Sequence, residues 1–150
     1  MNMICVPLDI RPYNYDFLIS QASMDSKLSL KMPAKDILGY KKQPASHQAV
    51  DEFINSHCAD AAALIISLDM YLYGGLFPAR IHQMELSELT ARMNKIKSLK
   101  ERYPSLKIYA SSLVLRTPKY NSSEEEPDYY ARIGHSIFQV GYLSDKEKRV

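Results

Sequence analysis

Three apolar runs, separated by segments with helical periodicity, constrain the fold of this chain more than any other feature. The runs are Met3–Leu8, Ala61–Leu68 and Lys107–Leu115. Apolar runs of this length without strict alternation are typical of strands that are covered on both faces, as in parallel sheets flanked by helices. The sequence therefore predicts three buried, parallel strands.

The segments between and after these runs have the periodicity of amphipathic helices. Ser46–Cys58 begins with a candidate N-cap and continues with an apolar face. Over Leu86–Tyr103, apolar residues recur at steps of three and four, and Pro104 ends the pattern because proline cannot continue a helix. A last helix is expected to begin near Pro127.

Alternating strands and helices predict the α/β class with a parallel sheet, as the first part of either a barrel-like or an open domain. We expect residues 1–150 to form a single α/β domain. The stretch Leu28–Tyr40 leaves room for one short extra strand. Because three clear strands are few for a complete domain, we expect the chain either to be an N-terminal fragment of a larger domain or to pair with other chains. Its unpaired sheet edge would favour self-association.

Composition and charge exclude several classes of partner. The 19 Lys and Arg residues nearly balance the 17 Asp and Glu residues, without the basic cluster that nucleic-acid binding requires. The longest uncharged apolar block, Ala61–Leu68, is far shorter than the roughly 20 residues that span a bilayer, and no signal-like run is present. We therefore expect a cytoplasmic protein without nucleic-acid or membrane partners. Cys5 and Cys58 are expected to be reduced packing residues.

Charged side chains directly follow each expected strand. Asp9 follows the first strand, Asp69 the second and Arg116 the third. In parallel α/β folds the ligand lies beyond the carboxyl ends of the strands, which are about 4.7–4.9 Å apart, so these side chains are expected to converge. Two carboxylates are able to act as general acid and base or to bind a divalent cation. The competing interpretation is that each Asp caps the loop that follows it.

Other residues on the same loops are candidates for ligand contacts. Arginine forks suit a carboxylate or phosphate, and Tyr rings suit a flat ligand such as a sugar. The candidate substrate-binding residues are Arg11, Asn14, Tyr73, Gly74, Gly75, Arg80 and Arg116. The Tyr cluster consists of Tyr13, Tyr15, Tyr71 and Tyr73. Its rings are expected either to stack on such a ligand or to cover the end of the sheet.

No cofactor is identified by a motif. Gly74 and Gly75 favour a turn, because both the dinucleotide fingerprint and the phosphate loop are missing from the sequence. The four histidines lack the spacing of a zinc site, so no metal ligands are assigned. Among them His82 is the best placed, because it follows the second strand just after Arg80.

Four landmarks carry a resemblance to a known family. They are Val6–Asn14, Ser67–Leu76 with Arg80 after it, Ile108–Ser112 running to Arg116, and Glu124–Glu126 followed by Asp128–Tyr130. With them, the chain resembles the bacterial proteins grouped as domain of unknown function 4127. Members of that family are several times longer, so the resemblance implies an N-terminal portion. It favours as site residues Asp9, Arg11, Asn14, Asp69, Tyr73 and Arg80, and it implies no reaction.

Two functional hypotheses follow. In the first, the chain is part of a hydrolase-like α/β enzyme that acts on a polar small molecule, most plausibly a carbohydrate, with Asp9 and Asp69 as its catalytic pair. Glycosidic hydrolysis requires two carboxyl groups about 5–5.5 Å or about 6.5–9.5 Å apart. In the second, the chain is a truncated, non-catalytic fragment or a small-molecule-binding module in which the same residues support the loops.

Overall fold

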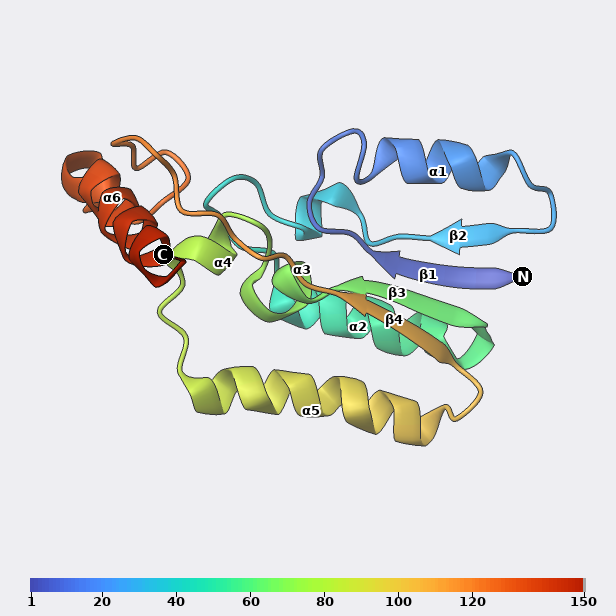
Figure 1. Cartoon of the computed structure of the whole chain (residues 1–150). Helices are drawn as coiled ribbons and strands as arrows, with labels where there is room; N and C mark the ends of the chain where they lie inside the picture. The colour runs from blue at the N-terminus through green and yellow to red at the C-terminus, as the bar shows by residue number, and fades with distance from the viewer. Residues whose placement is uncertain (150) are drawn as a thin grey trace. The chain divides into compact units, whose positions relative to one another are not determined.

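The computed structural model describes residues 1–149 and contains a four-stranded, all-parallel sheet. Its strands are β1 (Asn2–Val6), β2 (Ser29–Lys31), β3 (Ala63–Ser67) and β4 (Lys107–Ser111). The spatial order is β2-β1-β3-β4 (Figure 1). The α/β prediction is confirmed, and within the described residues the sheet is open and does not close into a barrel.

Helices alternate with the strands. They are α1 (Asp16–Ser23), α2 (His47–His57), α3 (Leu68–Tyr73), α4 (Pro78–Ile81), α5 (Leu86–Arg102) and α6 (Tyr130–Lys148), and single 3-10 turns occur at Lys35–Ile37 and Cys58–Asp60. The predicted boundaries of α2 and α5 are correct to within one residue. Ser46 caps α2 as predicted, since its hydroxyl accepts a hydrogen bond from the Ala49 N–H at 3.3 Å.

Two predictions about local structure were wrong. The segment after the second strand was predicted to be a loop, but it forms α3, which Ser67 caps by accepting from the Met70 N–H at 3.4 Å. Six residues are too few to show a helical period. The third strand was predicted to be buried and to reach Leu115, but β4 ends at Ser111 and is largely exposed. It is an edge strand, and Tyr109 on it is 56% exposed.

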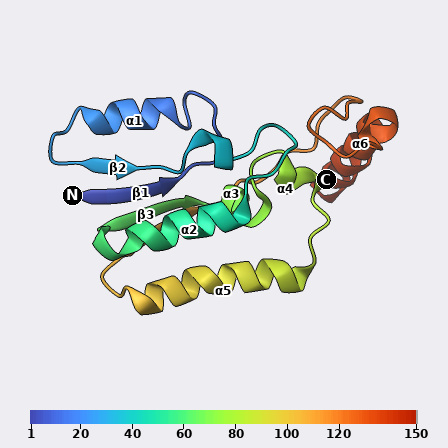
Figure 2. The same cartoon turned by 180° about the vertical axis from the view of Figure 1, so that it is seen from behind.

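The core lies on one face of the sheet, between the sheet and helices α2 and α5. Figure 2 shows α2 in front of the sheet, with α5 running alongside it. The buried residues of this face are Ile4, Val6, Leu64 and Ile66 from the strands, Val50 and Ile54 from α2, and Leu99 from α5. Burial of each such side chain contributes about 1.5–3 kcal/mol, so this face fixes the positions of the strands. On the opposite face Ile65 is 37% exposed.

The outer edge of β4 is not paired with any other strand within residues 1–149, so self-association through that edge stays a prediction.

Cys5 and Cys58 are buried and form no disulfide. Burial raises the pKa of each thiol to about 11, so both are protonated packing residues at neutral pH. Among the helices described, none has the length and apolar character needed to cross a membrane.

The chain divides into two compact units, Met1–Ser112 and Leu113–Val150. The first holds the sheet with α1 to α5, and the second holds α6 and the segment before it. Within the second unit, that segment lies against the helix. The His135 N–H donates to Oδ1 of Asn121 at 2.9 Å, and Nδ1 of His135 lies 2.8 Å from the Lys119 carbonyl oxygen. That all 150 residues form one domain stays a prediction.

Candidate functional site

The strand order defines where a ligand is expected to bind. β1 and β3 are neighbours, but the chain after β1 leads to β2 on one side of this pair, whereas the chain after β3 leads to β4 on the other side. In open parallel sheets, ligands bind outside the carboxyl ends of the strands at such a reversal. Val6 pairs with Ile66 across β1 and β3, and Asp9 and Asp69 each follow three residues later. The two carboxylates therefore follow neighbouring strands at the same interval in the sequence, on either side of the reversal.

Arg116 does not follow its strand as closely in the sequence as Asp9 and Asp69 follow theirs. Ile66 pairs with Ala110, so Arg116 follows its strand at twice the interval that separates Asp69 from Ile66. It also belongs to the second unit, where its Nη2 donates to the hydroxyl of Tyr120 at 3.4 Å. The sequence predicted that Arg116 lies beside Asp9 and Asp69, because β4 was predicted to end four residues later than it does.

Asp9 organises the loop after β1. Its Oδ1 accepts hydrogen bonds from the Arg11 N–H at 3.0 Å and from Nδ2 of Asn14 at 2.8 Å. Its Oδ2 accepts from Nε of Arg11 at 2.7 Å and forms an ion pair with Nη2 of the same residue at 2.6 Å. Arg11 also lies over the Tyr13 ring, 5.1 Å from its centroid. Two predicted ligand-binding residues, Arg11 and Asn14, are thus engaged by Asp9.

These hydrogen bonds favour the ionised form of the Asp9 carboxyl group. Burial alone raises the pKa of this carboxyl group, but the hydrogen bonds from Arg11 and Asn14, together with the positive charge of Arg11, outweigh it and leave the pKa below its ordinary value. Asp9 is therefore a carboxylate at neutral pH. In that form it suits a base or a nucleophile, whereas it is a poor proton donor.

Asp69 lies in the first turn of α3 and is 3% exposed. An acidic residue at this position interacts favourably with the positive end of the helix dipole. Its backbone carbonyl accepts a hydrogen bond from the Gly75 N–H at 3.1 Å. The sequence predicted an accessible loop carboxylate here, but the formation of α3 buries the residue.

Gly74 and Gly75 end α3, as the prediction of a turn required. Gly74 has a φ of +88° and Gly75 a φ of +132°, conformations that L-residues with side chains rarely adopt. The Gly74 N–H donates to the Met70 carbonyl at 2.9 Å, and the Gly74 carbonyl accepts from the Ala45 N–H at 3.0 Å. A Cβ atom on Gly74 would lie 2.7 Å from the Ala45 nitrogen. The chain after β2 therefore packs directly against the turn after β3.

This contact brings together the two walls of a pocket of about 440 Å³. Lys42 and His47 come from the chain after β2, and Tyr73, His82 and Glu88 come from the chain after β3. The Tyr73 and His82 rings are stacked, with centroids 4.4 Å apart. The volume falls within the range of about 300–1,000 Å³ that is typical of small-molecule sites.

His47 is the polar group of this pocket with an unused hydrogen-bonding atom. Its Nε2 is buried and has no hydrogen-bond partner within residues 1–149. Burial lowers the pKa of the ring, and the positive charge of Arg92 lowers it further, against the opposing effect of Asp51 and Glu88. The imidazole is therefore neutral at pH 7. A buried polar atom without a partner is costly, and a ligand in the pocket would relieve that cost.

The remaining predicted residues divide between this pocket and the core. Tyr73 lines the pocket, whereas Arg80 lies in α4 and is half-buried. Of the Tyr cluster, Tyr15 and Tyr71 are buried, which favours the alternative that these rings cover the sheet instead of stacking on a ligand. The Tyr15 hydroxyl donates to the Pro33 carbonyl at 2.7 Å. Within residues 1–149, no three His, Cys, Asp or Glu side chains are grouped closely enough to hold a metal ion.

Comparison with known proteins identifies a family. The sequence matches the family described as "Protein of unknown function (DUF4127)" over residues 3–150. No match was found among curated proteins or among solved structures.

The close approach at Gly74 leads to a first prediction. We expect Gly74→Ala to lower the free energy of unfolding by at least about 1–3 kcal/mol, because Ala would adopt a strained φ and its methyl group would overlap the backbone of Ala45. The matched control is Gly75→Ala, whose Cβ would have no neighbour closer than 3.7 Å, so only the conformational strain applies. Urea unfolding followed by circular dichroism measures both, and equal losses would contradict the close approach.

A second prediction concerns His47 and pH. The folded state keeps its imidazole neutral, so below the ordinary pKa of about 6.5 the unfolded chain takes up a proton that the folded chain does not. Stability therefore falls as the pH falls from 7.5 to 5. His47→Gln should narrow the difference between the urea midpoints at these two pH values.

The control is Ser46→Ala, which removes the cap of the same helix without removing a titrating group. This substitution should lower the free energy of unfolding by about 0.5–2 kcal/mol at every pH. The burial of a neutral His47 is contradicted if His47→Gln leaves the pH dependence of the wild-type chain unchanged.

Proposed function

Because the chain belongs to the DUF4127 family, whose description assigns no activity, we propose a function from the site: the carboxyl edge of the sheet binds a small, polar, sugar-like molecule. The pocket between the chain after β2 and the chain after β3 carries this proposal. It combines the stacked rings of Tyr73 and His82 with the buried Nε2 of His47, which has no hydrogen-bond partner in the part of the chain that the structure describes.

The lining favours a sugar-like ligand over a nucleotide. Aromatic rings offer flat faces to the apolar side of a sugar, and a neutral imidazole donates to or accepts from a hydroxyl group. Lys42 and Glu88 supply charges of opposite sign at the same pocket. A phosphate-binding loop, which a nucleotide site of this fold would use, is missing from the sequence. A cytoplasmic, bacterial setting without nucleic-acid or membrane partners is part of the same proposal and rests on sequence alone.

Hydrolysis is a second candidate function, and one specific observation favours it. Asp9 and Asp69 follow neighbouring strands at the same interval in the sequence, beside the reversal of the strand order. In this proposal the ionised Asp9 acts as the base or nucleophile, and Asp69 is the second carboxyl group of the pair. Because Asp69 is 3% exposed, substrate would have to reach it through movement of the chain around α3.

The binding proposal is tested by two-dimensional NMR titration with glucose, galactose, glucosamine and glucuronate. We expect at least one of them to give saturable shifts at Tyr73, His47 and His82. Tyr73→Ala should raise the Kd about 3- to 10-fold, since an aromatic contact of this kind contributes about 0.5–1.5 kcal/mol. Tyr13→Ala is the control, because Tyr13 is 59% exposed and does not line the pocket. No saturable shift with any of the four sugars, or an equal effect of both variants, would contradict the proposal.

The hydrolase proposal is tested with a panel of nitrophenyl glycosides. If one is turned over, Asp9→Asn and Asp69→Asn should each lower kcat at least about 100-fold while the far-UV spectrum is retained. Asp36→Asn is the control, because Asp36 is an exposed carboxylate in the turn at Lys35–Ile37. Retained turnover in the Asp9 and Asp69 variants would reject this function. Loss of folding in Asp69→Asn, without any turnover by the wild-type chain, would favour a structural role for that residue.

A further inference from the structure

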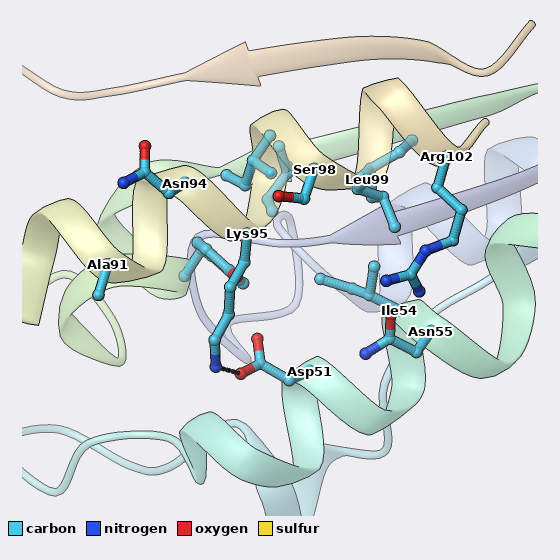
Figure 3. A pocket seen from close by; sticks show the side chains of 13 residues that line it. Asp51, Ile54, Asn55, Ala91, Asn94, Lys95, Ser98, Leu99 and Arg102 are labelled. Atoms are coloured by element: carbon cyan, nitrogen blue, oxygen red, sulfur yellow. Dashed lines mark hydrogen bonds and ion pairs between the residues drawn. The ribbon is translucent and has the colours of Figure 1, made fainter. Parts of the chain in front are cut away.

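A second pocket, of about 390 Å³, lies between α2 and α5 (Figure 3). It shares no lining residue with the pocket proposed above to bind a sugar-like molecule. Its floor is apolar and reaches the sheet, where Leu64 and Ile66 are fully buried, and its side walls carry Ile54 and Leu99. The two helices are therefore not packed tightly against each other along this stretch. The space left between them extends down to the core.

The position of α5 is fixed by a buried polar network that stands at one end of this pocket. Arg92 is 7% exposed and donates to the Tyr71 carbonyl from Nε at 3.0 Å and from Nη2 at 2.6 Å. Its Nη1 lies 3.6 Å from Oδ2 of Asp51, which also accepts from Nζ of Lys95 at 2.7 Å. Asp51 is thus neutralised by two cations. The pocket is held open by bonds between α5, α2 and α3, so its shape exists before any ligand enters.

The upper walls of the pocket carry polar groups that are not used in the fold. Asn55, Asn94 and Ser98 line it, and within residues 1–149 their side chains make no hydrogen bond. Arg102, at the end of α5, likewise makes no ion pair there, and in Figure 3 it extends toward Asn55. Since Lys95 is already paired with Asp51, Arg102 leaves the lining with an excess positive charge.

We propose that this pocket binds a small organic carboxylate with an apolar body. A guanidinium group offers a planar fork that matches a carboxylate, and the Asn55 amide is able to donate beside it. The body of the ligand lies on Ile54, Leu99 and the floor from β3. This combination of an apolar floor with a few converging polar groups is the usual composition of a small-molecule site.

The proposal is tested on the whole chain by two-dimensional NMR titration with sodium benzoate. Benzamide, which is neutral and has nearly the same shape, is the comparison ligand. Benzoate should give saturable shifts at Asn55, Asn94, Ser98 and the Arg102 side chain, and benzamide should bind about 10-fold more weakly, because its amide lacks the charge that strengthens the bond to Arg102.

Three variants make the test specific. Arg102→Gln should raise the Kd for benzoate about 10-fold. Lys97→Gln removes the same charge from an exposed position of α5 outside the pocket and should leave the Kd unchanged. Ser98→Leu should fill the pocket and abolish the shifts while the far-UV spectrum is retained. The proposal is overturned if benzamide binds as tightly as benzoate, if Lys97→Gln weakens binding as much as Arg102→Gln, or if the shifts are confined to Tyr73 and His82.

Discussion

The hydrogen bond from the Ala45 N–H to the Gly74 carbonyl, at 3.0 Å, joins the chain that follows β2 to the chain that follows β3. The strands that precede these two segments lie on opposite sides of β1, and the segments themselves supply the two walls of the pocket at the carboxyl edge. The bond is possible because Gly74 has a left-handed conformation and lacks the Cβ that would overlap Pro44 and Ala45. The walls of the site therefore depend on one residue without a side chain.

The parts of the fold that the sequence predicted are those with a strong local signal. The apolar runs of β1 and β3 are long enough to be recognised, and α2 and α5 have clear periodicity. β2 has only three residues and α3 only six, so neither repeats a pattern often enough to identify it. The exposure of β4 was missed for another reason, since an apolar strand at a sheet edge has the same composition as one in the middle.

The site was predicted in part for the same reasons. The sequence correctly predicted that Asp9 and Asp69 follow parallel strands of one sheet, which are neighbours. That their carboxyl groups act as a pair stays a prediction. Lys42 and His47 were missed, because they can be assigned to the carboxyl edge of the sheet only when β2 is known to precede them. For Tyr15 and Tyr71 the sequence left two roles open, since composition does not tell whether a ring faces solvent or the core. Which of these loop residues contact a ligand follows from the packing of distant segments, which no local pattern encodes.

If the contact at Gly74 builds a ligand pocket at the carboxyl edge from the segments after β2 and β3, crystals of the chain soaked with a library of small polar fragments will show it. We expect the bond between Ala45 and Gly74 in the crystal, with fragment density against Tyr73 and His82 and within hydrogen-bonding distance of Nε2 of His47. A crystal in which these segments are apart, or in which fragments bind elsewhere and leave this pocket empty, would contradict it.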